Sequence, residues 1–302
     1  MARPDFPVTL PDFIRRFPDE KACWQYLVDS RWPDGWSCPD CGERKGYLIA
    51  KRKVFECIKG HQISVTAGTV MHGTRMPLVA WFQTAFMVTT HTPGLSALQL
   101  ARQLGTSYET AYMMLQKLRT GMVRPEREPL KGRIQADETY IGGRRPGKRG
   151  RGAAGKAIVA GAVEVRGKHA GRLRLLLIPD VRRMTLERFV LDNVTKGSTI
   201  ITDSMESYAH LPRFGCRHEI AKGETQKEIS EELGLIHRIF GNLKTWLLGT
   251  HHGRVEVKHL QGYLNEFVFR FNRRGTPMAA FQTVLGIGSH IHGPTYKGIY
   301  RG

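Results

Sequence analysis

The sequence predicts a mixed α/β layer fold for the C-terminal half of the chain, preceded by a small β module and a helical region. Three observations predict it. Three runs of β-forming residues follow one another between residues 131 and 180, a helical pattern and another apolar strand come next, and two long amphipathic helices follow residue 233. Strands in succession, then helix, strand and helices, are typical of a sheet covered by helices.

The N-terminal part divides into three segments. Residues 1–35 are expected to be helical, around "LPDFIRRFPDEKACWQYLVDSRW". Residues 36–75 are rich in glycine and short alternating runs, which predicts a small β module. Residues 76–128 turn helical, and "SALQLARQLG" and "TSYETAYMMLQKLRTGM" meet at Gly105, with Thr106 or Ser107 as the N-cap. These are helix-turn-helix proportions, although an ordinary helical hairpin would have the same pattern.

The larger domain is expected at 129–275. Its predicted strands are "GRIQADETYIGG", "KAIVAGAVEV", "GRLRLLLIPD" and "STIITD", with the helix "TLERFVLDNV" before the last of them. The loop 143–156 between the first two strands is almost entirely glycine and basic residues, so we expect it to be mobile. Residues 276–302 show no periodicity and are expected to form a flexible tail.

Composition limits the class of partner. Lysine and arginine number 46 against 27 acidic residues, a formal charge of +19, which favours a polyanion such as nucleic acid over a protein that is merely soluble. No stretch approaches a membrane span and no basic-then-apolar leader opens the chain, so we expect a reducing, cytoplasmic location without membrane contact. In that compartment the five cysteines are interpreted first as metal ligands.

Four residues in the β module have the spacing of a zinc ribbon. Cys38 and Cys41 form C-x2-C, and Cys57 and His61 form C-x3-H across a predicted hairpin. Three thiolates and one imidazole complete a tetrahedral zinc site and leave no position for water, so the predicted site is structural. His72 is the second choice for the fourth ligand.

Two aspartates follow apolar, β-branched runs: Asp137 after "RIQA" and Asp203 after "TIIT". Carboxylates that leave neighbouring strands at one sheet edge can share two divalent cations for in-line phosphoryl transfer. A lone aspartate at a strand end is more often a turn residue, but two of them in so basic a chain favour a metal site. Glu138 should point to the opposite face of its strand and is left out.

These residues and their surroundings resemble a known family. "CPDCG", "SVTAGTVMHGTR", "ADETYIGG", "TDSMESY" and "NLKTWLLGTHHGRVEVKHLQGYLNEFVFRFNRR" together are similar to bacterial insertion-sequence transposases with a zinc ribbon and a DDE-type, RNase H-like catalytic domain. The resemblance covers roughly residues 10 to 275. It implies Mg²⁺-dependent DNA cleavage and strand transfer, and binding of terminal inverted repeats by the N-terminal zinc and helical regions. Asp137 and Asp203 match the first two catalytic acids of the family.

The third catalytic position varies in that family among acid, asparagine and histidine, and a lysine follows it. Lys244 matches the lysine, and either His237 or Asn242 could be the third residue. At about 100° per residue, His237 and Lys244 lie about 20° apart on the helix, whereas Asn242 lies about 140° from His237. We therefore predict His237, with Asn242 as the alternative. Imidazole binds Mg²⁺ poorly and Mn²⁺ more readily, so Mn²⁺ is also possible.

The expected partner is double-stranded DNA, as transposon ends and as target, bound by a homodimer or larger oligomer at the bacterial nucleoid. The predicted phosphate contacts, apart from Lys244, are basic residues of the loop and of the last helix end: Arg144, Arg145, Lys148, Arg149, Arg151, Arg273 and Arg274. Two alternatives remain: a DNA-binding regulator that has lost strand transfer, because the third acid is absent, and a metal-dependent nuclease.

Overall fold

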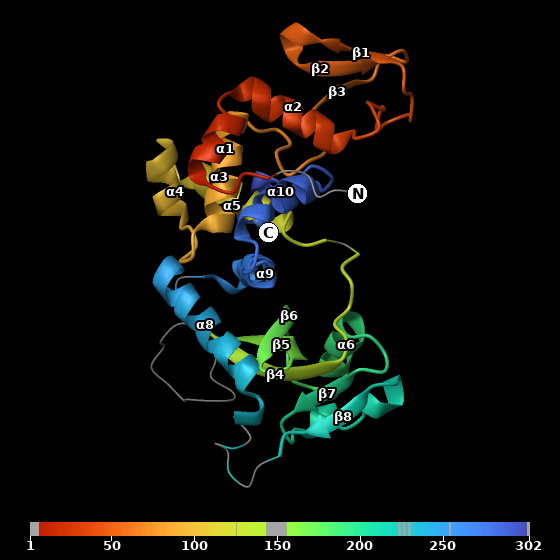
Figure 1. The fold of residues 1–302 in the computed structure, drawn as a ribbon, viewed down its shortest axis with the longest axis vertical. Coiled ribbons are helices and arrows are strands. Elements are labelled where there is room, and N and C mark those ends of the chain that lie inside the picture. Colours follow the sequence, from red (N-terminus) through yellow and green to blue (C-terminus); the bar gives the residue numbers. More distant parts are fainter. Residues whose placement is uncertain are drawn as a thin grey trace. The chain divides into compact units, whose positions relative to one another are not determined.

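The computed structural model describes residues 6–124, 126–142, 156–222, 225, 228, 231–253 and 255–300 (Figure 1). The chain divides into two compact units. One contains Met1–Arg124 together with Gly275–Gly302, and the other contains Pro125–Arg274. Among the described helices, none combines the length and apolarity that crossing a membrane requires.

The first unit is mostly helical. Its helices are α1 (Leu10–Arg16), α2 (Glu20–Arg31), α3 (Leu78–Thr90), α4 (Ala97–Leu104), α5 (Tyr108–Thr120), α10 (Pro277–Gly288) and α11 (Tyr296–Tyr300). Phenylalanine rings join three of them: Phe13 of α1 stacks on Phe86 of α3 at 4.5 Å and meets Phe281 of α10 edge-on at 5.5 Å. Helices from both ends of the chain therefore share one core.

The expectation of a flexible tail at 276–302 is wrong for its first part. Residues 277–288 form α10, whose Phe281, Val284 and Leu285 are fully buried. Pro277 occupies the first turn, where its missing N–H costs nothing. The apolar residues recur at helical spacing over only two turns, which is too short a pattern to recognise in a segment otherwise rich in glycine.

Helices α4 and α5 meet in a tight turn. Gly105 adopts φ +61°, a left-handed conformation that ends α4, and Ser107 Oγ accepts a hydrogen bond from the Thr110 amide at 3.2 Å. Of the two expected caps, Ser107 is therefore the one used.

The same unit contains a small antiparallel sheet. In the described residues it consists of β1 (Gly46–Ile49), β2 (Val54–Cys57) and β3 (Gln62–Ser64), with the short 3-10 turn η1 (Ala50–Arg52) between the first two. Phe55 of β2 is surrounded by the rings of Trp24, Trp32 and Trp36 at 5.3–5.8 Å. This aromatic cluster fastens the sheet to α2.

The second unit is built on a mixed sheet. Its strands are β4 (Arg133–Ile141), β5 (Ala157–Arg166), β6 (His169–Ile178), β7 (Thr199–Thr202) and β8 (Arg217–Ile220). Their order in the described residues is β6-β5-β4-β7-β8. Strands β4, β5 and β6 pair antiparallel, whereas β7 is parallel to β4 and β8 is parallel to β7. Three antiparallel strands extended on one side by parallel ones give the RNase H-like sheet.

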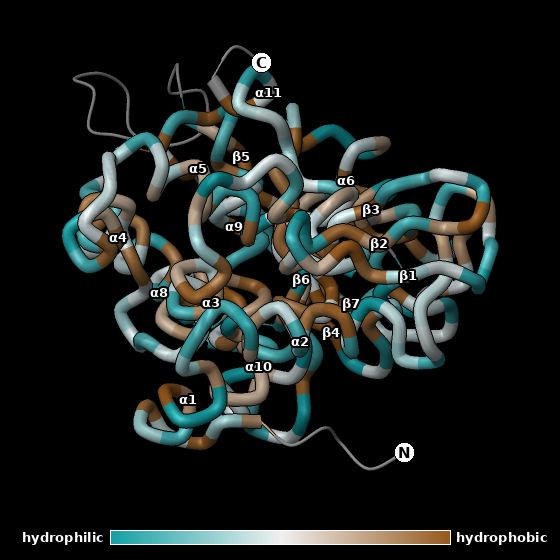
Figure 2. The backbone as a smooth tube through the Cα atoms, turned by 90° about the horizontal axis from the view of Figure 1, so that it is seen from above, coloured by the Kyte–Doolittle hydropathy of each residue, from teal (hydrophilic) through white to brown (hydrophobic). Residues whose placement is uncertain are grey.

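Helices cover both faces of this sheet. One face packs against α8 (Gly234–His251) and α9 (Val257–Asn272), and the other against α6 (Arg183–Asn193) and the 3-10 turns η2 (Glu206–Tyr208) and η3 (Leu211–Phe214). The apolar runs of the strands, brown in Figure 2, fill the two interfaces. The four strands and the helix α6 predicted from sequence are present.

Strand β8 was missed. Its four residues, "RHEI", alternate too briefly and are mostly exposed, so they carry no apolar pattern of their own. The predicted mobile loop at 143–156 lies outside the described residues, apart from Lys156.

Candidate active site and zinc cluster

Asp137 of β4 and Asp203, the residue that follows β7, occupy matching positions on two adjacent parallel segments. The pairing of β4 with β7 runs from Arg133 opposite Thr199 to Gln135 opposite Ile201, and two further residues on each strand lead to the two aspartates. Asp137 was expected at the end of its strand, but it is the fifth residue of the nine in β4. It is nevertheless open toward β7, because β7 ends at Thr202 and pairing stops before Asp137 is reached.

Helix α8 brings a third side chain to this point. Nε2 of His237 lies within hydrogen-bond distance of Oδ2 of Asp137, at 2.9 Å, while Oδ1 accepts from the Glu138 amide at 2.8 Å. The His237 and Asp137 side chains are 35% and 16% exposed, so solvent and a substrate can reach the pair. Asp203 Oδ1 accepts from the Met205 amide at 3.0 Å, which holds its carboxylate in a tight turn.

The electrostatics of Asp137 reflect this crowding. Burial raises the pKa of Asp137, and the negative charge of Asp203 raises it further, against the lowering effects of the Glu138 amide and of His237. The Asp203 carboxylate is thus close enough to disfavour ionisation of Asp137, as in sites where carboxylates share a cation.

The packing of α8 decides which of its residues face the site. Ile236, Phe240, Leu243 and Leu247 are buried against the sheet, and His237 borders this stripe. Lys244 lies close enough to Asp137 for that carboxylate to act on its pKa, which is lowered overall because burial outweighs the attraction. Asn242 is exposed. The structure therefore brings His237 to Asp137, while its chemical role stays a prediction.

Glu138 faces away from the pair, as expected, and has a hydrogen-bond partner on the other face of the sheet. Its Oε2 accepts a hydrogen bond from the buried hydroxyl of Tyr208 at 3.2 Å. Tyr208 lies five residues after Asp203, so this bond ties the chain segment beyond β7 to β4 on the opposite face of the sheet. Nothing in the sequence signals it, because the partners are 70 residues apart.

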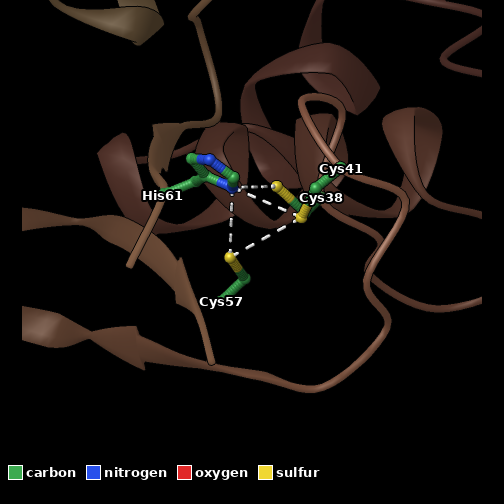
Figure 3. A group of neighbouring side chains, drawn as sticks. All are labelled: Cys38, Cys41, Cys57 and His61. Carbon is green, nitrogen blue, oxygen red and sulfur yellow. Dashed lines mark hydrogen bonds between the residues drawn. The ribbon is translucent and has the colours of Figure 1, made fainter. Parts of the chain in front are cut away.

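The four predicted zinc ligands come together in the first unit (Figure 3). The donor atoms of Cys38, Cys41, Cys57 and His61 all lie within 4.8 Å of one another. The Sγ atoms of Cys41 and Cys57 are 3.9 Å apart, and His61 Nδ1 lies 3.3–3.7 Å from the three sulfurs. Ligands of one tetrahedral zinc would be separated by about 3.6–3.8 Å, so the donors fit a structural zinc.

His72, the second choice for the fourth ligand, is elsewhere. Its Nδ1 accepts a hydrogen bond from the Gly68 amide at 3.2 Å, and its ring lies 5.0 Å from that of His292.

The predicted DNA contacts are only partly visible. Arg144, Arg145, Lys148, Arg149 and Arg151 lie outside the described residues. Arg273 and Arg274 stack over Phe269 and Phe271 at the end of α9, and both guanidinium groups donate to backbone carbonyls of that helix. They are thus partly engaged in capping α9, and their contact with DNA stays a prediction.

Comparison with known proteins agrees with this architecture. Residues 129–272 match the family model described as an ISXO2-like transposase domain, and residues 18–59 match the model of a transposase zinc-ribbon domain. A relative in Halobacterium salinarum, an uncharacterized protein in transposable element ISH50, is 26% identical over 132 residues. That match covers 42% of this chain and 44% of the relative's length. The catalytic core domain of BIV integrase aligns with 51% of this chain at 16% identity and a TM-score of 0.28, covering 81% of the integrase chain.

The two matches lie in different units of the chain: the zinc-ribbon model in the first and the transposase-domain model in the second. A zinc ribbon followed by an RNase H-like domain with clustered aspartates defines an insertion-sequence transposase architecture. Residues 129–272 are thus an ISXO2-like transposase domain, and residues 18–59 are a transposase zinc ribbon.

Proposed function

We propose that this protein is a DNA transposase that cleaves transposon ends and joins them to target DNA by in-line phosphoryl transfer. The observation that supports it most directly is the meeting of Asp137, Asp203 and His237 in the domain matched by the transposase model. Asp137 is in contact with His237 and close enough to Asp203 to be affected by its charge, and these three residues come from distant parts of the sequence.

The donor set fits divalent cations. Carboxylate oxygens are ligands for Mg²⁺ and Mn²⁺, and the imidazole of His237 favours Mn²⁺. The raised pKa of Asp137, which burial and then the charge of Asp203 explain, indicates a deficit of positive charge that a cation would relieve. Bound there, two such cations would activate the attacking water or 3′-hydroxyl and stabilise the leaving oxygen.

The remaining residues have positional tasks. His237 stands beside Asp137 and would orient the reacting groups or share the cation with it. Lys244 projects from the exposed side of α8 within the influence of Asp137, where an ammonium group would hold the phosphate next to the scissile bond.

The partner that suits this chain is double-stranded DNA. A formal charge of +19 gives the strong, salt-dependent attraction that a polyanion provides. We assign recognition of the terminal inverted repeats to the zinc ribbon and the α4–α5 turn, and phosphate contacts to the basic segment 144–151 with Arg273 and Arg274. Bringing two ends together requires at least a dimer.

The experiment supplies Mn²⁺ or Mg²⁺ and labelled duplex that carries the transposon end, and measures 3′-end cleavage and joining. Asp137→Asn and Asp203→Asn should each abolish both products while DNA binding is retained. Binding without products from the unsubstituted protein would support a regulator, an alternative that rests on histidine in place of a third acid. Cleavage of arbitrary duplex without joining would support a nuclease.

A further inference from the structure

A buried glutamine on β4 holds the beginning of helix α8. The Gln135 side chain is in a residue only 6% exposed. Its Oε1 accepts hydrogen bonds from the amides of Leu235 at 3.0 Å and Ile236 at 3.1 Å. Its Nε2 donates to the carbonyl of Glu232 at 2.7 Å. The Gln135 side chain thus bonds both the residue before the helix and the first turn of the helix itself.

Helix α8 depends on this outside partner. The first amides of a helix have no acceptor within it, and a serine, threonine, asparagine or aspartate at the N-cap usually provides one. Here the N-cap is Leu233, and among the described residues it makes no side-chain capping bond. Gln135 Oε1 takes that place for the second and third helical residues, the positions that an N-cap side chain serves.

The same strand and the same helix also carry the site. Gln135 and Asp137 are two residues apart on β4, so both side chains point to the α8 face of the sheet. His237 follows Ile236 directly on the helix. Residue 135 therefore holds the two amides that precede His237, and residue 137 meets His237 itself at 2.9 Å.

We propose that Gln135 is a positioning residue that sets His237 against Asp137, an inference that rests on the proposed strand-cleavage function. Three hydrogen bonds at the helix start fix both the height and the rotation of the first turn above the strand. Without them, the Leu235 and Ile236 amides lose their acceptors and the turn loosens. A shift of about 1 Å in a reacting group can cost about 10²-fold in rate.

The test compares Gln135→Met with Gln261→Met. Both changes keep the length of the side chain and remove its polar head. Gln261 is the matched control, because it also ties a helix to a strand: its Oε1 accepts from the Leu177 amide of β6 at 2.9 Å, and the α9 helix that carries it packs on the same face. Cleavage of labelled transposon-end duplex in Mn²⁺ and hydrogen exchange of residues 233–240 are measured for each.

In Gln135→Met, the Leu235 and Ile236 amides should exchange hydrogen about 10-fold faster or more. The cleavage rate should fall about 10²-fold, with DNA binding unchanged. Gln261→Met should leave both readouts within about 2-fold of the unsubstituted protein. Normal cleavage by Gln135→Met, slow cleavage with unchanged exchange at 235–236, or equal losses in both variants would overturn the proposal.

If Gln135→Met does not fold, Gln135→Glu replaces it, since a carboxylate can still accept from both amides. That variant should keep their protection and cleave more than 10-fold faster than His237→Ala; loss of the protection, or cleavage as slow as that of His237→Ala, would overturn the proposal. An unsubstituted protein that cleaves no DNA would refute the proposed function instead, and the exchange measurement would then still decide whether Gln135 caps α8.

Discussion

Nε2 of His237 lies 2.9 Å from Oδ2 of Asp137, although 100 residues separate them in the chain. Asn242, five residues further along the same helix, is exposed. Of the two residues predicted for the third position, His237 is thus the one that contacts Asp137, and its catalytic role stays a prediction. Substituting His237 and Asn242 separately therefore tests which of them is the third catalytic residue.

His237→Ala should lower the rate of strand cleavage by about 10²-fold or more, because a group in contact with the reacting centre is lost. Asn242→Ala should stay within about 2-fold of the unsubstituted protein. His237→Asp should retain activity and shift the preference from Mn²⁺ toward Mg²⁺, since a carboxylate is the harder ligand. The measurement is single-turnover cleavage in each cation. If Asn242→Ala were inactive while His237→Ala stayed active, Asn242 and not His237 would be the third residue.

Gly161 allows α8 to approach the sheet. It pairs with Asp137 across β4 and β5, and a Cβ there would lie 2.7 Å from the Phe240 ring and 3.0 Å from Ile236. Gly161→Ala should therefore destabilise the protein by about 1–3 kcal/mol and slow cleavage, as the helix is pushed away from Asp137. Gly241→Ala is the control: it has open space within α8 and should raise stability by about 0.5–1 kcal/mol. Thermal or urea unfolding measures both, and a neutral Gly161→Ala would contradict this packing.

Removal of zinc should unfold the ribbon. The β1–β3 sheet is small, and zinc would hold the four ligands beside it together. A strong chelator should therefore separate the aromatic rings around Phe55 and change tryptophan fluorescence. The unsubstituted chain should contain one zinc ion, and Cys57→Ser should lose it. Cys216→Ser, in a buried cysteine of the other unit, should keep it. A chelator that leaves both fluorescence and melting unchanged would argue against the metal.

Stability should fall in acid because of Glu164. Burial opposes its ionisation, but hydrogen bonds from Arg172, the Lys131 amide and Arg166 prevail and hold its pKa at about 2. Because the folded pKa lies below the ordinary value of 4.5, the contribution is complete above that value. It is lost as the pH falls toward 2, and amounts to on the order of 3 kcal/mol. In Glu164→Gln, the urea concentration at the unfolding midpoint should change less between pH 5 and pH 3 than in the unsubstituted protein. An equally steep decline in that variant would mean that other carboxylates cause the loss of stability in acid.

Local sequence determined much of this molecule. The zinc ligands are recognisable because C-x2-C and C-x3-H are short-range spacings, and the strands β4 to β7 are recognisable from their β-branched and apolar residues. The side of α8 that faces the sheet also follows from helical periodicity, which places His237 beside the buried stripe. Patterns failed where they were short, as in β8 and α10.

Only the tertiary structure decided how distant segments meet. The register of β4 with β7 aligns Asp137 with Asp203, Gly161 lets α8 come close, and Gln135 provides a cap that the helix does not encode in its own first turn. The physical reason is the distance along the sequence over which each kind of interaction acts. Periodicity and ligand spacing act over a few residues, whereas these contacts join residues 66 to 101 positions apart, and they exist only once the sheet and helix are packed.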